Sequence, residues 1–232
     1  MPPDIDMIGD VDALELQIGH GHVVYTGGAQ GTDELVEQMA KQFGMQVEVL
    51  VPPNHPRATF ITPSTVEVLM LANPHLHQAA EKLGKRMPSH FYTLQLLQRN
   101  YQIAKKAHTI YAFGILEPDH KRVKGGTGWT VQLAMDQGKP VYLFDIPSQS
   151  WYRWYRSDHY YQVNENAATL VTGSQFVPWG PKKPTLHQSS AIVGSRDVDD
   201  KTRAEIQALF NRTFCLPENI DQLRLELEDF HL

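Results

Sequence analysis

The chain has 232 residues, of which 41% are hydrophobic and 20% are charged, and this composition predicts a folded domain with a sizeable core. The formal net charge of −5, from 21 Lys and Arg against 26 Asp and Glu, argues against a dedicated nucleic-acid binder. A single cysteine, Cys215, excludes an intrachain disulfide, and with no signal-peptide pattern and no apolar run near the roughly 20 residues of a membrane span it predicts a cytoplasmic protein with no membrane partner.

Short apolar runs alternate with helix-period runs from residue 23 onward. Strands are predicted at 23–26, 47–51, 109–113 and 140–145. Helices are predicted at 35–43, 64–72, 76–83, 92–107 (capped by Ser89) and 129–137. This alternation predicts an α/β fold with a Rossmann-like, doubly wound, mostly parallel sheet and helices on both faces. The strands are almost continuously apolar, as in a sheet that is buried on both sides.

The pattern changes after residue 146. Residues 147–187 are rich in aromatic residues and proline and predict an irregular or hairpin extension. A further strand is predicted at 190–196, followed by a helix through Phe210 with Asp199 or Asp200 as its N-cap, and by a short helix at 220–230. We therefore expect one Rossmann-like domain over residues 1–232, with a core of 20–146 plus 188–214.

Two glycine-rich loops are candidates for binding an anion. Each follows a strand or polar loop and opens a helix, where glycine permits close approach and free N–H groups face the ligand. The predicted ligand-binding residues are Gly27, Gly28, Gly31 and Thr32 in the first loop, and Gly125, Gly126, Thr127, Gly128, Trp129 and Thr130 in the second. Either loop alone is also typical of a tight turn between strand and helix. Two of them at the carboxyl edge of one sheet favour a phosphate-bearing ligand.

Residues 23–145 resemble the SLOG superfamily. The resemblance lies in the two loops, in Gln98-Arg99-Asn100 on the helix before the strand at 109–113, and in Lys139-Pro140-Val141-Tyr142. That group of Rossmann-like nucleotide-binding proteins includes the LONELY GUY (LOG) phosphoribohydrolases, the DNA-processing protein A family and the YpsA-like proteins. The glycine loops are most similar to the YpsA-like forms. The resemblance implies that Arg99 faces the ligand phosphate.

The hydrolytic motif of the LOG proteins is only partly present. Their pattern Pro-Gly-Gly-x-Gly-Thr-x-x-Glu meets Lys124, Trp129 and Gln132 where it has Pro, Thr and Glu. Gln132 can hydrogen-bond a ribose but cannot accept a proton as a general base. Asp33 and Glu34 are the carboxylates left as candidate catalytic residues. Their alternative role is to complement the dipole at the start of their helix.

The resemblance also implies a circular permutation. SLOG domains begin with a strand that ends in Gly-Ser-Arg or a similar sequence, and here that sequence is Gly194-Ser195-Arg196, near the C-terminus. We therefore expect residues 190–195 to supply the first, central strand, between 23–26 and 109–113, and these three residues to join the ligand site. The alternative is an edge strand added to an ordinary sheet.

Three functions follow from these observations. The first is binding of a phosphorylated nucleoside or nucleotide-derived small molecule, and the second is LOG-like phosphoribohydrolase activity that cleaves the N-glycosidic bond of a nucleoside monophosphate. The third is binding of single-stranded DNA through the aromatic and basic residues 151–156, against which the net charge argues. The 11 histidines show no metal-ligand spacing, so we expect no metal and no cofactor. The family resemblance implies a homodimer.

Overall fold

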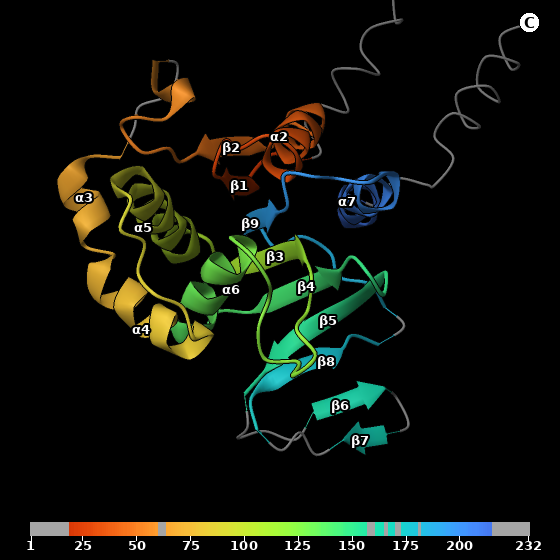
Figure 1. The fold of residues 1–232 in the computed structure, drawn as a ribbon. Helices are drawn as coiled ribbons and strands as arrows, with labels where there is room; N and C mark the ends of the chain where they lie inside the picture. Colours follow the sequence, from red (N-terminus) through yellow and green to blue (C-terminus); the bar gives the residue numbers. More distant parts are fainter. Residues whose placement is uncertain are drawn as a thin grey trace, which may run out of the picture.

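A computed structural model describes residues 19–59, 64–156, 161–164, 167–169, 173–180 and 182–214. Its centre is a seven-stranded sheet with the strand order β2-β1-β9-β3-β4-β5-β8 (Figure 1). The strands β2 (Gln46–Val49), β1 (Val23–Thr26), β9 (Ser189–Gly194), β3 (Thr109–Gly114) and β4 (Val141–Asp145) are parallel. The strands β5 (Ser150–Tyr155) and β8 (Gln175–Pro178) continue the sheet in antiparallel order.

The last strand in the sequence lies in the middle of the sheet. Ala191 of β9 is in register with Tyr25 of β1 on one side and with Ile110 of β3 on the other, and both pairings are parallel. The sequence prediction of an interior parallel strand between these two neighbours is confirmed, and the alternative of an edge strand is wrong. The carboxyl end of β9 therefore lies between the two glycine loops.

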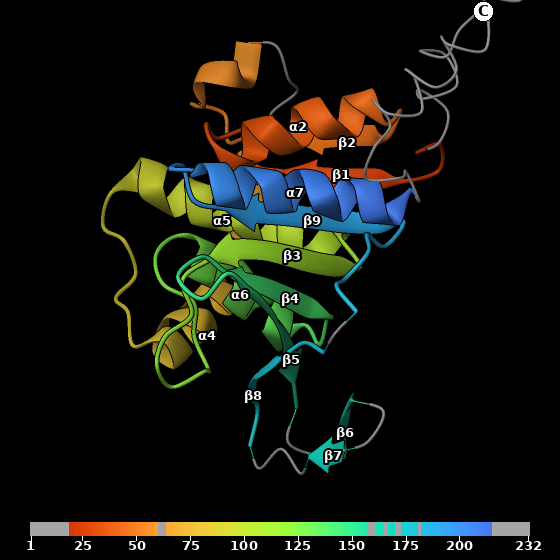
Figure 2. The same ribbon diagram turned by 90° about the vertical axis from the view of Figure 1, so that its right-hand side faces the viewer.

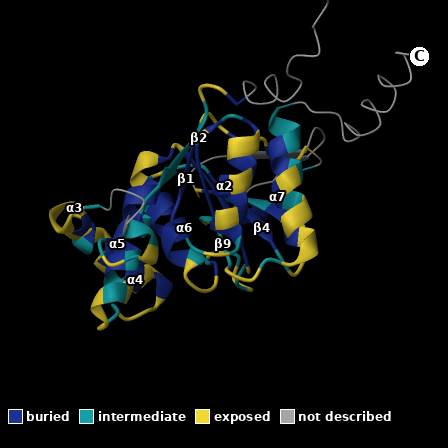
Figure 3. Ribbon diagram, turned by 90° about the horizontal axis from the view of Figure 1, so that it is seen from above, coloured by how far each residue is buried: buried dark blue, intermediate teal, exposed yellow. Residues whose placement is uncertain are grey.

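Helices cover both faces of the sheet (Figure 2). The helices α2 (Thr32–Gln42) and α7 (Asp200–Thr213) pack on one face, where alternate strand residues such as Val24 and Ile192 join their apolar side chains. The helices α4 (Asn73–Leu83), α5 (Phe91–Lys106) and α6 (Thr127–Asp136) belong to the opposite face. The burial view shows α2 and α7 buried toward the sheet and exposed on their outer sides (Figure 3). This two-residue alternation of facing side chains is the pattern of a sheet buried on both sides.

Several helix boundaries differ from the sequence prediction. Between β2 and α4, the chain forms a short 3-10 helix, η1 (Pro56–Thr59), and the five-residue helix α3 (Val66–Met70). Asn73-Pro74 begins α4, because proline fits the first turn of a helix, where its missing N–H is not needed. His90, and not Ser89, is the N-cap of α5. Asp199 caps α7 as predicted, accepting the Thr202 N–H at 2.7 Å. Cys215 and the helix predicted at 220–230 lie outside the described residues.

The extension at residues 147–187 is more regular than predicted. Its strands β5 and β8 add to the sheet beside β4, and β6 (Tyr161–Asn164) and β7 (Ala167–Thr169) form a separate hairpin. Trp151 is buried, and its indole Nε1–H donates to Glu205 at 2.8 Å. The Arg153 guanidinium lies 5.1 Å from the ring centre of Trp179. Trp151 and Arg153 thus make contacts within the protein, and the net charge already argued against the alternative that residues 151–156 bind single-stranded DNA.

Candidate functional site

Three chain segments meet at the carboxyl edge of the parallel strands. The first glycine loop (residues 27–31) follows β1, residues 194–196 begin at the last residue of β9, and the second glycine loop (residues 124–128) runs into the first turn of α6. A cleft of about 570 Å³ lies between them and α5, and we call it the central cleft. The predicted site residues that line it are Asp33, Arg99, Gly125, Gly126, Thr127, Thr130, Gly194, Ser195 and Arg196. Ligands of open α/β sheets bind at such an edge, where the strand order reverses.

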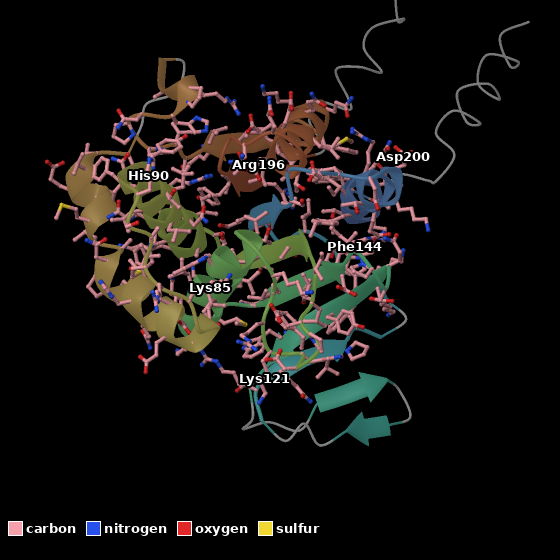
Figure 4. All side chains as sticks on the ribbon, in the orientation of Figure 1. Lys85, His90, Lys121, Phe144, Arg196 and Asp200 are labelled. Atoms are coloured by element: carbon pink, nitrogen blue, oxygen red, sulfur yellow. The ribbon has the colours of Figure 1, made fainter. Side chains whose placement is uncertain are left out.

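The first glycine loop and the end of β9 are locked together. Thr32 donates to the Ser195 carbonyl twice, from its N–H at 3.2 Å and from its Oγ1 at 2.9 Å. A Cβ atom added to Gly31, whose φ is 84°, would overlap the Arg196 carbonyl, and one added to Gly194 would collide with Thr32. Gly31, Thr32 and Gly194 thus shape the site from behind and place Arg196 beside the loop. Figure 4 labels Arg196 after β9.

Asp33 uses its carboxylate to hold the first loop. Its Oδ2 accepts the N–H groups of Gly27 at 3.0 Å and Ala29 at 3.2 Å, and the residue is only 7% exposed. Burial raises the pKa of this carboxyl, against the opposing effects of Arg99 and the two backbone donors. The N–H groups of Gly27 and Ala29, which the sequence pattern suggested as phosphate donors, therefore already donate to the Asp33 carboxylate.

The second glycine loop leads into a helix whose first backbone donors have no side-chain cap. Gly126 is the N-cap of α6 and no side chain caps this helix, so the first N–H groups lack the partner that a capped helix provides. Open space surrounds the positions of a Cβ at Gly125 and Gly126. Gly128 instead packs against the Val123 carbonyl, where a Cβ would overlap it. The start of α6 thus faces the central cleft with uncompensated donors and the positive end of its dipole.

Arg99 brings a buried cation from α5 to the first loop. Its guanidinium lies directly on Gly27, where a Cβ atom would overlap Nη1. The residue is 7% exposed, and its Nε–H has no hydrogen-bond partner among the described residues. Among the ion pairs within 4.0 Å in the described part of the chain, none includes Arg99. Burial lowers the pKa of Arg99 while nearby Asp33 opposes this shift, but an arginine remains charged at neutral pH.

A second cleft adjoins the first across Arg99. This side cleft, of about 680 Å³, lies between the start of α2, η1 and the first turn of α5. Gly28 and Glu34 line the side cleft, whereas Asp33 lines the central one, so the two candidate catalytic carboxylates do not converge on one reacting atom. Arg99 and Arg196, both predicted from the sequence, also line it, whereas His55, Arg57 and Tyr92 were not predicted. His55 and Arg57 follow β2 closely and so lie at the same edge of the sheet, and this position in the sequence could have identified them as candidate site residues.

Two predicted site residues lie elsewhere. Gln132 lines a separate groove and donates from Nε2 to Asp136 at 2.8 Å. Trp129 is buried, with Lys85 Nζ 5.9 Å from its ring centre, and lines neither cleft. Lys85, another residue that the sequence analysis missed, donates to the Gly125 carbonyl at 3.1 Å and is labelled in Figure 4. The second loop therefore contributes its backbone, Thr127 and Thr130 to the central cleft.

Neither the protein-family models, nor the curated proteins, nor the solved structures compared with the chain gave a match. In the residues that the structure describes, no three His, Cys, Asp or Glu side chains are grouped as metal ligands. No described helix has the length and apolar character to cross a membrane. The geometry of the two clefts is therefore the basis for assigning a function.

Proposed function

We propose that the protein binds a phosphorylated nucleoside or nucleotide-derived small molecule in the central cleft. The observation that carries this proposal is Arg99, a buried guanidinium with no ion-pair partner in the described part of the chain. A buried charge is costly unless it is paired. A phosphate placed between Arg99 and the uncapped start of α6 compensates both the charge and the open backbone donors.

The remainder of the central cleft suits the rest of a nucleotide. Apolar side chains line it, including Leu96, Leu97, Ile103, Ile115 and Ile146. The volume of about 570 Å³ lies within the range of about 300–1,000 Å³ that is typical of small-molecule sites. Asn100, Thr127 and Thr130 also line the cleft and supply polar groups that can orient a sugar or base. This combination supports a ligand with one phosphate end and one flatter, less polar end.

We also propose that the fold is a circularly permuted SLOG domain. The support is the place of β9 between β1 and β3 and the contact of residues 194–196 with the first glycine loop. In this arrangement, the strand that leads to Gly194-Ser195-Arg196 follows the other parallel strands in the sequence but lies between two of them in the sheet. Chain ends that lie near one another make such a rearrangement physically accessible.

Hydrolysis of the bound ligand is a second candidate function. The observation in its favour is Asp33, a carboxyl group in the central cleft whose pKa is raised by burial. Its Oδ2 is held by the N–H groups of Gly27 and Ala29, which is the arrangement of a loop-fixing residue. Binding without efficient base release is therefore the favoured function.

The test is a thermal-shift screen against nucleoside monophosphates, with each hit then incubated with the protein and analysed chromatographically for free base. A ligand at 100 times its Kd adds about 2.7 kcal/mol to the free energy of unfolding. Arg99→Met should reduce the shift, while Arg203→Met, at an exposed position on α7 outside both clefts, should preserve it. No shift with any monophosphate, or an equal shift with Arg99→Met, contradicts the proposed site.

A further inference from the structure

The central and side clefts are two halves of one larger site. They share Ala29, Leu96, Arg99 and Arg196, so both guanidinium groups stand where the clefts meet. Each cleft alone has the volume of a small-molecule site, at about 570 and 680 Å³. A nucleoside monophosphate that places its phosphate on Arg99 and its nucleoside in the central cleft leaves the side cleft to a second group.

Two of the cationic side chains of the side cleft belong to this junction. Arg57, which lines only the side cleft, is neutralised by Glu37 through two hydrogen bonds of 2.8 Å. Arg99 and Arg196, by contrast, take part in none of the ion pairs within 4.0 Å among the described residues. Lys41, farther along α2, also lines the side cleft and takes part in none of these ion pairs. An anionic group therefore has two cationic partners at the junction and a third, Lys41, farther along α2.

The side cleft also has groups that can hydrogen-bond a hydroxyl-bearing moiety. His55 Nδ1 accepts the Arg57 N–H at 3.2 Å, which leaves Nε2–H as the ring's other donor. Burial and the neighbouring Arg99, Arg57 and Arg196 lower the pKa of His55, so the ring is neutral at pH 7. Tyr92 adds an aromatic ring with a hydroxyl group, and the Glu34 carboxylate is exposed in the same cleft.

We infer that the ligand is bipartite: a nucleoside diphosphate whose terminal phosphate carries a second sugar or nucleoside. The two phosphates lie at Arg99 and Arg196, the first nucleoside fills the apolar central cleft, and the second moiety fills the polar side cleft. The exposed Glu34 carboxylate accepts hydrogen bonds from the hydroxyls of that second sugar. This inference rests on the proposed function, since it takes the phosphate site of the central cleft as its starting point.

Calorimetric titration with two series of compounds tests the inference. The first series is AMP, ADP and ADP-ribose, and the second is UMP, UDP and UDP-glucose, so that either base class can reveal the effect. In the series that binds, we expect the conjugate to bind at least about tenfold more tightly than the monophosphate, the gain of roughly one added charge-assisted hydrogen bond.

Variants of side-cleft residues test whether the higher affinity for the conjugate comes from the side cleft. Glu34→Gln and Tyr92→Ala should reduce the ratio of conjugate to monophosphate affinity by about tenfold. Glu81→Gln, an exposed position on α4 outside both clefts, is the matched control and should leave this ratio unchanged. A monophosphate that binds without any gain for its conjugate, or a gain that survives both variants, overturns the bipartite ligand alone. Failure of every compound in both series to bind overturns the proposed function as well.

Discussion

Gly27→Ala should disable the phosphate site by moving a different residue, Arg99. A Cβ atom at position 27 would overlap Arg99 Nη1, so the guanidinium must leave its place over the loop. The displaced atom is the end of a flexible side chain, and Gly27 does not have a positive φ, so the backbone accommodates alanine. The fold should therefore persist while the cation is lost from the cleft.

The magnitude follows from the environment of Arg99. Among the described residues, its Nε–H has no hydrogen-bond partner and no carboxylate forms an ion pair with it within 4.0 Å, so its guanidinium can bond a phosphate. A hydrogen bond to a charged group contributes about 1.5–3 kcal/mol, which corresponds to a loss of roughly 10- to 150-fold in affinity. Gly27→Ala should cause a loss within this range, and Arg99→Met should cause a similar one.

A double-mutant cycle distinguishes this mechanism from a general disturbance of the loop. The Kd of the tightest nucleoside monophosphate is measured by calorimetry for the wild type, Gly27→Ala, Arg99→Met and the double variant. If alanine acts only by displacing the arginine, Gly27→Ala has no further effect in the Arg99→Met background. Additive losses, or full affinity in Gly27→Ala, would refute the assigned position of Arg99.

Three further predictions concern the residues around the clefts. Thr32→Val removes the Oγ1 bond to Ser195 and should lower the free energy of unfolding in urea by about 1 kcal/mol; an unchanged midpoint would remove this bond from the account. Asp33→Asn should gain stability relative to the wild type as pH rises from 3.8 toward the raised pKa of the folded Asp33 carboxyl, because burial disfavours the charged form. Urea unfolding across this pH range measures the difference in the free energy of unfolding, and a difference that does not change with pH would contradict this reasoning. The Gln132→Glu variant should release no free base from a nucleoside monophosphate, which chromatography checks. It should also be less stable than the wild type in urea unfolding, because the new carboxylate lies beside Asp136.

The sequence predicted the sheet because its signals are local and repetitive. Apolar runs marked every parallel strand, and Gly194-Ser195-Arg196 marked the strand that joins the centre of the sheet. The β5 and β8 strands were less visible, since their aromatic and basic side chains do not form a simple apolar run. Their strand conformation depends on pairing with β4, a long-range contact that local propensity does not encode.

The candidate site was predictable at its backbone but not in its side-chain orientations. Both glycine loops, Arg99 and residues 194–196 meet as expected at one edge of the sheet. The sequence did not reveal that the Asp33 carboxylate occupies donors of the first loop, because that contact depends on the turn geometry between Gly27 and Asp33. Nor did it reveal that Gln132 points toward Asp136, since a motif position does not fix which side of a helix faces a cleft.

The most direct test of the phosphate site is an amide chemical-shift titration of the 15N-labelled protein with AMP or UMP, whichever binds. The start of α6 has uncapped donors, whereas those of Gly27 and Ala29 are bonded to Asp33. We expect the largest shifts at the amides of residues 125–128 and at the Arg99 Nε–H, with smaller shifts at Gly27 and Ala29. Shifts that are largest at the first glycine loop, or that leave Arg99 and residues 125–128 unaffected at saturation, would contradict the account.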